Sequence, residues 1–135
     1  MADSMAFEVK LDVGYDEALQ RVTEALAKEG FGVLTRIDVH EAFKDKIGVD
    51  FRPYSILGAC NPKLAHKALS GRPEAGLLLP CNVTVERDGE GALVRIIDPD
   101  EMMKAGGMGA DATLAEVGRE ARERLARVAA ALAAS

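Results

Sequence analysis

The stretch Val83–Ile97, VTVERDGEGALVRII, decides the fold. Two apolar runs flank a short segment, Asp88 to Gly91, that is rich in glycine and charge. Such a segment between two strand-like runs is typical of a β-hairpin. Because the hairpin leaves no room for a helix between its strands, the sequence favours antiparallel pairing and disfavours a doubly wound parallel sheet.

Upstream of the hairpin, strand and helix patterns alternate. Phe7 to Leu11 alternates apolar and polar residues, as a half-buried strand does. Ala18 to Leu26 carries apolar residues at helical spacing, and Gly30 is placed to end that helix. Pro53 has no amide hydrogen, which predicts an edge strand or a bulge. Further strands are expected at 31–39, 51–60 and 77–85, short helices at 40–47 and 61–69, and a loop at 71–76.

The last helix has the clearest pattern. Its apolar residues step by three and four from Leu114 to Leu132 and form one stripe. Thr113 and Glu116 fit a capping box at its start. The order of strand, helix, several strands and a final helix predicts an α+β fold, with a mostly antiparallel sheet and helices covering one face.

Composition narrows the class of protein. The chain has 135 residues, 48% hydrophobic and 29% charged, which suits a single globular domain spanning 1–135. Its net charge of -5, the lack of a basic stripe and the absence of Trp argue against nucleic-acid binding and anionic membrane surfaces. No apolar run reaches the length of a membrane span, and residues 1–5 do not resemble a secretory signal. We therefore expect a cytoplasmic protein with reduced cysteines.

Two cysteine-asparagine segments resemble a known family. The stretch 57–65, LGACNPKLA, and the stretch 79–83, LPCNV, resemble two segments of the domain of unknown function 302 family, and Asp98-Pro99 falls where that family often has a matching pair. The resemblance covers about residues 7–132. It implies a TBP-like β-α-β(4)-α fold that is often dimeric. It implies no activity, because the family is named for having none assigned.

Cys60 and Cys81 are the candidate functional residues with the most reactive side chains. Cys60 precedes Asn61, a good helix N-cap, and Pro62, a favoured first helical residue, so the helix dipole could enrich its thiolate. The alternative is a small buried side chain at a tight strand-to-helix junction. Cys81 repeats the pair with Asn82. If the strands bring the cysteines together, they could form a redox pair or bind a soft metal, and the asparagine amides could surround a small ligand.

Other catalytic or metal-binding functions have less support from the sequence. His66 on the second short helix is a candidate general base without an acid partner, and a surface histidine is the simpler interpretation. Two Cys and two His at unrelated spacings do not make a tetrahedral zinc site. The Met-rich stretch Glu101–Met108 is expected to be a mobile loop, with copper-binding thioethers as the alternative. No metal site or cofactor is evident.

Two hypotheses remain. The first is a non-catalytic small-ligand-binding or interaction domain that works as a homodimer, because no complete catalytic set is present. The dimer would form through a sheet edge or an apolar helix face, and the family resemblance and the apolar run Leu77 to Leu79 motivate it. The second is a thiol-dependent redox or soft-metal-binding protein that uses Cys60 and Cys81.

Overall fold

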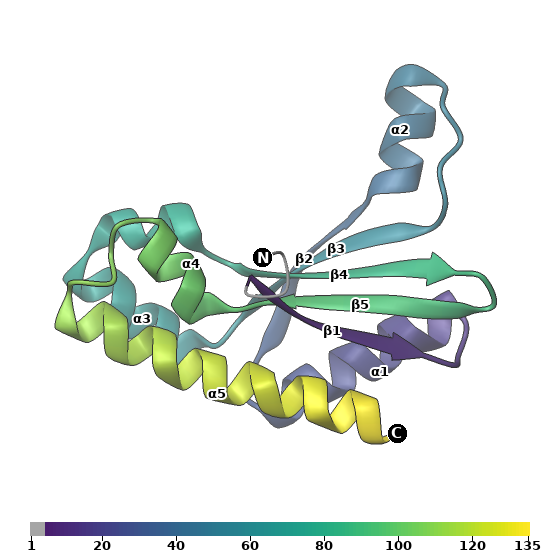
Figure 1. Cartoon of the computed structure of the whole chain (residues 1–135). Helices are drawn as coiled ribbons and strands as arrows, with labels where there is room; N and C mark the ends of the chain where they lie inside the picture. The colour runs from purple at the N-terminus through teal and green to yellow at the C-terminus, as the bar shows by residue number, and fades with distance from the viewer. Residues whose placement is uncertain (1–4) are drawn as a thin grey trace.

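A computed structural model describes residues 5–135 as one five-stranded antiparallel sheet with helices (Figure 1). The expectation that residues 1–5 are not a secretory signal falls mainly on residues 1–4, which lie outside the described residues. The strand order is β1-β5-β4-β3-β2. Without the short connecting helices, the chain runs strand, helix, four strands, helix, so the predicted α+β fold is confirmed. The elements are β1 (Ala6–Leu11), α1 (Tyr15–Lys28), β2 (Gly32–Asp38), α2 (Val39–Ile47), β3 (Tyr54–Cys60), α3 (Pro62–Gly71), the 3-10 helix η2 (Pro73–Leu78), β4 (Cys81–Asp88), β5 (Gly91–Ile97), α4 (Pro99–Ala105) and α5 (Ala112–Ala134).

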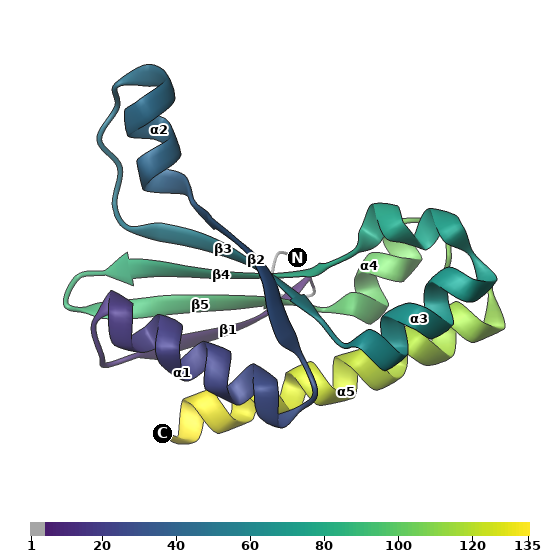
Figure 2. The same cartoon turned by 180° about the vertical axis from the view of Figure 1, so that it is seen from behind.

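The hairpin of β4 and β5 forms as predicted, with Asp88 opposite Gly91 and Val85 opposite Val94. Because side chains alternate between the two faces of a strand, one residue in two points to the core. Helices α1 and α5 cover that core face (Figure 2). We call the other side of the sheet the open face. The core side chains contributed by the strands include Val9, Leu57, Val83, Val85, Val94 and Ile96.

Helix α5 buries the predicted stripe, in which Leu114, Leu125 and Val128 are almost completely inaccessible. The predicted capping box is wrong. Asp111 is the N-cap, and its side chain accepts a hydrogen bond from the Leu114 amide at 3.0 Å. Thr113 therefore lies inside the first turn. Asp is as good an N-cap as Thr, and the sequence pattern alone did not separate the two.

Three other boundaries differ from prediction. The stretch 99–105 is helix α4 rather than a loop, because Asp98 caps it and Pro99 is its first residue. The apolar run at 77–79 belongs mainly to η2, and β4 starts at Cys81. The prediction that Pro53 lies in an edge strand or a bulge is wrong. Pro53 precedes β3, which is an interior strand. Its carbonyl accepts a hydrogen bond from the Arg87 amide at 3.0 Å.

An arm, residues 39–53, rises from the open face and contains α2 and the loop to β3 (Figure 1). None of the nine residues of α2 is buried. At the base of the arm, Arg52 donates to Glu86 of β4 at 3.0 Å and stacks 4.5 Å from the centre of the Phe51 ring. The arm is thus attached to the sheet while its helix stays in solvent.

Asp98 joins three elements at the end of β5. Its Oδ1 accepts hydrogen bonds from the amides of Asp100 and Glu101 at 3.0 and 3.3 Å, and its Oδ2 accepts one from Arg122 of α5 at 2.9 Å. The carboxylate is almost completely buried. A buried carboxylate needs such partners, because an unpaired charge there would be costly. Asp98 therefore fixes α4 and α5 relative to the sheet.

None of the helices within residues 5–135 combines the length and the apolar character needed to span a bilayer.

We predict that Asp98→Ala lowers the free energy of unfolding by about 2–3 kcal/mol, because it removes the cap and all three hydrogen bonds of a buried carboxylate. Asp98→Asn keeps the cap geometry and should cost less than Asp98→Ala. Urea denaturation followed by circular dichroism measures both. Glu101→Ala, which removes only an exposed ion pair with Lys104, is the control and should change stability by less than about 0.5 kcal/mol. Equal effects of Asp98→Ala and Glu101→Ala would contradict the assignment.

Candidate functional site

A small cavity lies where the sheet ends, between β3, β4, α3, α4 and α5. Its volume is about 30 Å³, room for one or two water molecules but not for a metabolite. Its lining is almost entirely apolar. The lining residues are Phe31, Ala59, Cys60, Asn61, Leu64, Ala65, Ala68, Leu79, Cys81, Pro99, Met102, Met103, Val117, Gly118 and Ala121.

The pairing of β3 with β4 brings the two cysteines to this cavity. Ala59 lies opposite Cys81, so Cys60, the next residue of β3, ends its strand beside the start of β4. Both cysteines are free thiols, Cys60 half-buried and Cys81 only 5% exposed. The register thus brings the two residues to the same end of the sheet, but alternation points the Cys60 side chain to the face opposite to that of Ala59 and Cys81.

Asn61 performs the predicted capping role. Its side-chain oxygen accepts a hydrogen bond from the Leu64 amide at 3.3 Å, and Pro62 is the first residue of α3. Asn61 is itself buried and packs against Gly30. A Cβ atom at Gly30 would stand 3.0 Å from the Asn61 amide nitrogen, and the backbone there has φ of 84°. Gly30 is therefore required both for the turn after α1 and for the position of Asn61.

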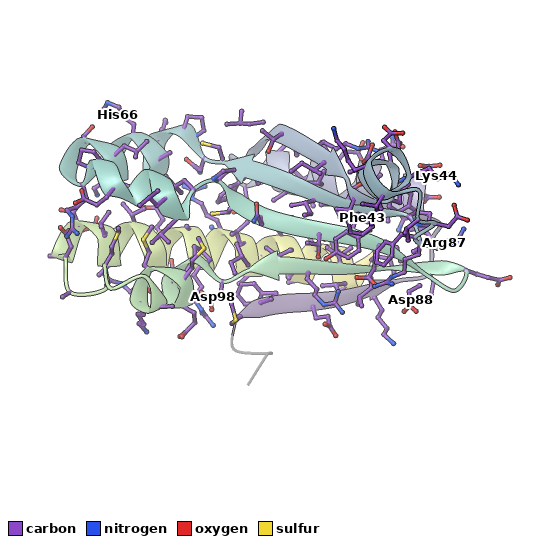
Figure 3. The ribbon with its side chains drawn as sticks, turned by 90° about the horizontal axis from the view of Figure 1, so that it is seen from above. Phe43, Lys44, His66, Arg87, Asp88 and Asp98 are labelled. Carbon is purple, nitrogen blue, oxygen red and sulfur yellow. The ribbon has the colours of Figure 1, made fainter. Side chains whose placement is uncertain are left out.

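Asn82 and His66 lie outside the cavity. Asn82 pairs with Gly58 on β3, so its side chain points to the open face, opposite to that of Cys81. His66 is exposed on α3, at the outer end of the molecule (Figure 3), and its Nε2 lies 3.5 Å from the Ser70 hydroxyl. The structure thus groups Cys60, Asn61 and Cys81, and separates the other two candidates from them.

Two methionines line the same cavity as the cysteines, a placement that the sequence did not predict. Helix α4 places Met102 and Met103 in the cavity lining. It approaches α5 closely at Gly118, where an added Cβ would lie 3.3 Å from Asp100 and 3.5 Å from Met103. The stretch expected to be mobile is therefore packed, with Met103 2% and Met108 8% exposed. The local signal was present: Asp98 followed by Pro99 is a helix start.

Burial controls the acidity of Cys81. Burial, together with the charge that nearby Cys60 would carry, raises the pKa of the Cys81 thiol to about 11. At neutral pH Cys81 is therefore a neutral thiol. Such a group is a poor nucleophile.

A second polar cluster lies at the base of the arm. The Tyr15 hydroxyl contacts the Ser55 hydroxyl, which donates to Asp38 at 2.6 Å, and Asp38 also accepts from Arg36 at 2.8 Å. His40 accepts a hydrogen bond from the Tyr54 amide at 3.0 Å through Nδ1. Ser55 is completely buried, so its hydroxyl is not available to a substrate. The cluster connects α1 and β3 to the first residues of the arm, and its role is positional.

We predict that Asp38 stabilises the protein at neutral pH and loses this effect in acid. The hydrogen bond from Ser55, with help from Arg36, lowers the pKa of Asp38 below its usual range. A group with a lowered folded-state pKa stabilises above the unfolded pKa, and the contribution disappears as pH falls through the folded value. Asp38→Asn should cost about 1 kcal/mol at pH 7, because water still reaches this carboxylate, and much less below about pH 3.

Urea denaturation from pH 2.5 to 8 measures the Asp38 effect, with Asp45→Asn as the control because Asp45 is an exposed acid on the arm that follows Asp38. A constant difference between Asp38→Asn and the wild type across this range would contradict the prediction.

We also predict that the two thiols differ in reactivity. Iodoacetamide at pH 7 should alkylate Cys60 in the native protein at least about a hundredfold faster than Cys81, because Cys81 is buried and has a raised pKa. Mass spectrometry of the Cys60→Ala and Cys81→Ala variants separates the two rates. In guanidinium chloride the rates should become similar. Equal rates in the native state would show that Cys81 is accessible.

Known proteins match this chain in sequence and in fold. The crystal structure of an uncharacterized conserved DUF302 protein from Bacillus stearothermophilus superimposes with a TM-score of 0.82 and 31% sequence identity, over 95% of this chain and 98% of that chain. No curated protein matches the chain. The family model for the domain of unknown function DUF302 matches residues 7–132, and the chain therefore belongs to the DUF302 family.

Proposed function

We propose that this chain is a non-catalytic interaction domain that functions as a homodimer, in which the arm of each protomer lies over the open face of its partner. One observation carries the proposal: the arm stands in solvent and exposes apolar side chains. Ile47, Val49 and Phe51 are 67%, 46% and 38% exposed. A short amphipathic helix gains its stability by burying an apolar face, and α2 buries none within its own protomer.

The arm is ordered rather than a loose loop. Phe43 and Phe51 meet edge to face with ring centres 5.2 Å apart, and Lys44 pairs with Asp50 at 2.9 Å. Gly48 ends α2 in the left-handed conformation that suits glycine. An ordered arm binds a partner with a smaller loss of conformational entropy than a disordered segment.

The open face supplies a surface for such an arm. Ile56, Leu93 and Ile97 point to this face, where they are half-buried, whereas α1 and α5 lie on the opposite side. Ile37 of the edge strand adds a side chain that is 52% exposed. Viewed from above, the arm stands at one end of this face, with α3 and α4 at the other end (Figure 3).

A second copy of the chain fits these two surfaces better than an unrelated partner. A two-fold axis applies each contact twice, so the arm and the open face of both protomers are covered together. The arm carries three acidic residues, Glu41, Asp45 and Asp50, and three basic residues, Lys44, Lys46 and Arg52. Its balanced charge favours neither an acidic nor a basic partner and adds no net repulsion between copies.

Enzymatic and metabolite-binding roles have less support. The volume of about 30 Å³ disfavours the cavity as a metabolite site. The raised pKa of Cys81 and the burial of Ser55 disfavour both as nucleophiles. Of the two roles in the first hypothesis, an interaction domain is thus better supported than a small-ligand-binding domain.

We predict that light scattering at micromolar concentration gives a dimer, with twice the chain mass of 14.4 kDa. The double variant Ile47→Asp, Val49→Asp should raise the dimer dissociation constant at least about tenfold, because it places unpaired charges in the interface. Both residues are exposed in the protomer, so folding should be unaffected.

Leu77→Asp is the matched control. Leu77 is 85% exposed, but it lies on η2 at the other end of the molecule. It should leave the dimer intact. A monomeric wild-type protein would overturn the proposal, and a dimer broken by Leu77→Asp but not by the arm variant would move the interface to η2.

A further inference from the structure

We propose that a hollow at the start of α3 binds a phosphate group through the side-chain amide of Asn61, both nitrogen atoms of Lys63 and the guanidinium of Arg124. We call it the anion hollow. Its volume is about 320 Å³, compared with about 30 Å³ for the cavity at the end of the sheet. None of its lining residues belongs to the arm, so the proposal does not depend on the dimer. The lining residues are Gly30, Asn61, Pro62, Lys63, Glu120 and Arg124.

Three segments that are far apart in the sequence form the hollow. They are the turn between α1 and β2, the start of α3 and the middle of α5 (Figure 2). Gly30 supplies the space between them. A Cβ atom added there would lie 3.0 Å from Nδ2 of Asn61 and 3.8 Å from Nη1 of Arg124. Nitrogen atoms from two segments thus approach one point that glycine leaves open to an incoming atom.

Asn61 carries an unused hydrogen-bond donor. The side chain is only 8% exposed, and its oxygen accepts from the Leu64 amide at 3.3 Å. Its Nδ2 has no hydrogen-bond partner within residues 5–135. It is not sealed inside the protein either, because Thr84 Oγ1 is the one fully buried side-chain polar atom without a partner in that range. An acceptor oxygen in the hollow would satisfy the amide.

The first turn of α3 leaves one backbone donor unused as well. Pro62 has no N–H group. The amides of Leu64 and Ala65 donate to the side chain and to the carbonyl of Asn61, at 3.3 and 2.9 Å. In the described part of the chain, the Lys63 amide is therefore the first-turn donor without an acceptor. The dipole of this ten-residue helix adds partial positive charge at the same place.

The charged groups around the hollow leave one positive charge unpaired. Glu120 is the acid in the lining, and it accepts from Arg124 at 3.1 Å. Lys63 forms no ion pair with any residue in 5–135. A chain with a net charge of -5 therefore has a locally positive site here. The neighbouring acids on α5 and at the end of α1 already have basic partners: Glu116 pairs with Lys67 at 2.8 Å, and Glu29 with Arg127 at 3.0 Å.

The number of donors favours phosphate over a carboxylate. Arg124 uses Nε for Glu120 and Nη1 for the carbonyl of Glu29 at 3.2 Å, which leaves Nη2. With Nδ2 of Asn61 and the two nitrogen atoms of Lys63, four donors surround the hollow. A phosphate group offers at least three strong acceptor oxygens and up to two negative charges, whereas a carboxylate offers two oxygens and one charge. The hollow also has room for part of the molecule that carries the phosphate.

The test is amide NMR spectroscopy of the isotope-labelled protein, titrated at constant ionic strength with sodium phosphate, glycerol phosphate or acetate. We expect saturable shifts of the Lys63 backbone and Asn61 side-chain signals with both phosphate compounds. Lys63→Ala should weaken binding at least about tenfold, because it removes a charged hydrogen bond. Asn61→Asp keeps the capping oxygen but replaces the donor with a negative charge, so it should also weaken binding at least about tenfold.

Lys67→Ala is the matched control. It removes the same charge one turn further along α3, where Lys67 pairs with Glu116 outside the hollow, and binding should change by less than about twofold. Circular dichroism checks the fold of each variant.

Absence of saturable shifts in the wild type would overturn the site, as would equal losses in Lys63→Ala and Lys67→Ala. Tighter binding of acetate than of both phosphate compounds would overturn the choice of phosphate. Tighter binding of glycerol phosphate than of inorganic phosphate supports the site and assigns it to a phosphorylated metabolite. Equal or tighter binding of inorganic phosphate supports the site and assigns it to the free ion.

Discussion

The register between β3 and β4 is the constraint on which the rest of the structure depends. Ala59 lies opposite Cys81 and Leu57 opposite Val83, so their side chains all point to the core face. A slip of one residue would turn the apolar side chains of one of the two strands, Leu57 of β3 or Val83 of β4, away from the core face. The apolar residues of both strands specify this register, because only one alignment buries both sets under α1 and α5. The position of the cavity at the end of the sheet follows from core packing.

The two faces of the sheet explain why the molecule has two kinds of surface. The core face is fully covered, with Val22, Leu26, Leu114 and Leu125 packed against the strands. The open face combines half-buried isoleucine and leucine side chains with ion pairs such as that between Arg95 and Glu86 at 2.7 Å. Such a mixed surface tolerates water and also suits a protein interface, which typically has an apolar centre and a polar rim.

Buried polar groups fix the positions of helix ends and of the arm, which the apolar core does not set. Asp98 holds α4 and α5 at the end of β5, and Asp38 with Ser55 holds the base of the arm. Both carboxylates precede a helix, and both also contact an arginine. Hydrophobic burial is not directional, so it brings layers together without setting the exact placement of a helix end. Hydrogen bonds to a partly or fully buried carboxylate supply that direction.

The site could be anticipated only in part. The cap at Asn61 and the strand position of Cys81 were local features and were predicted. Asn82 follows Cys81 directly, and the alternation of strand side chains sends it to the other face. Met102 and Met103 were assigned to a loop, because three nearby glycines outweighed the helix start at Asp98 and Pro99. Glu120 and Arg124, four residues apart on α5, form a local ion pair at 3.1 Å. Arg127 instead pairs with Glu29 from α1 at 3.0 Å, a contact between distant parts of the chain.

The sequence by itself determined which segments become strands and helices, and that the hairpin at 83–97 makes the sheet antiparallel. It did so because alternation, helical spacing, caps and turns act over a few residues. The tertiary structure alone decided that Cys60, Cys81, Met102 and Met103 share one cavity, and that α2 stands off the sheet. Those results depend on strand register and helix packing between residues far apart in the chain, and such contacts leave no periodic pattern in the sequence.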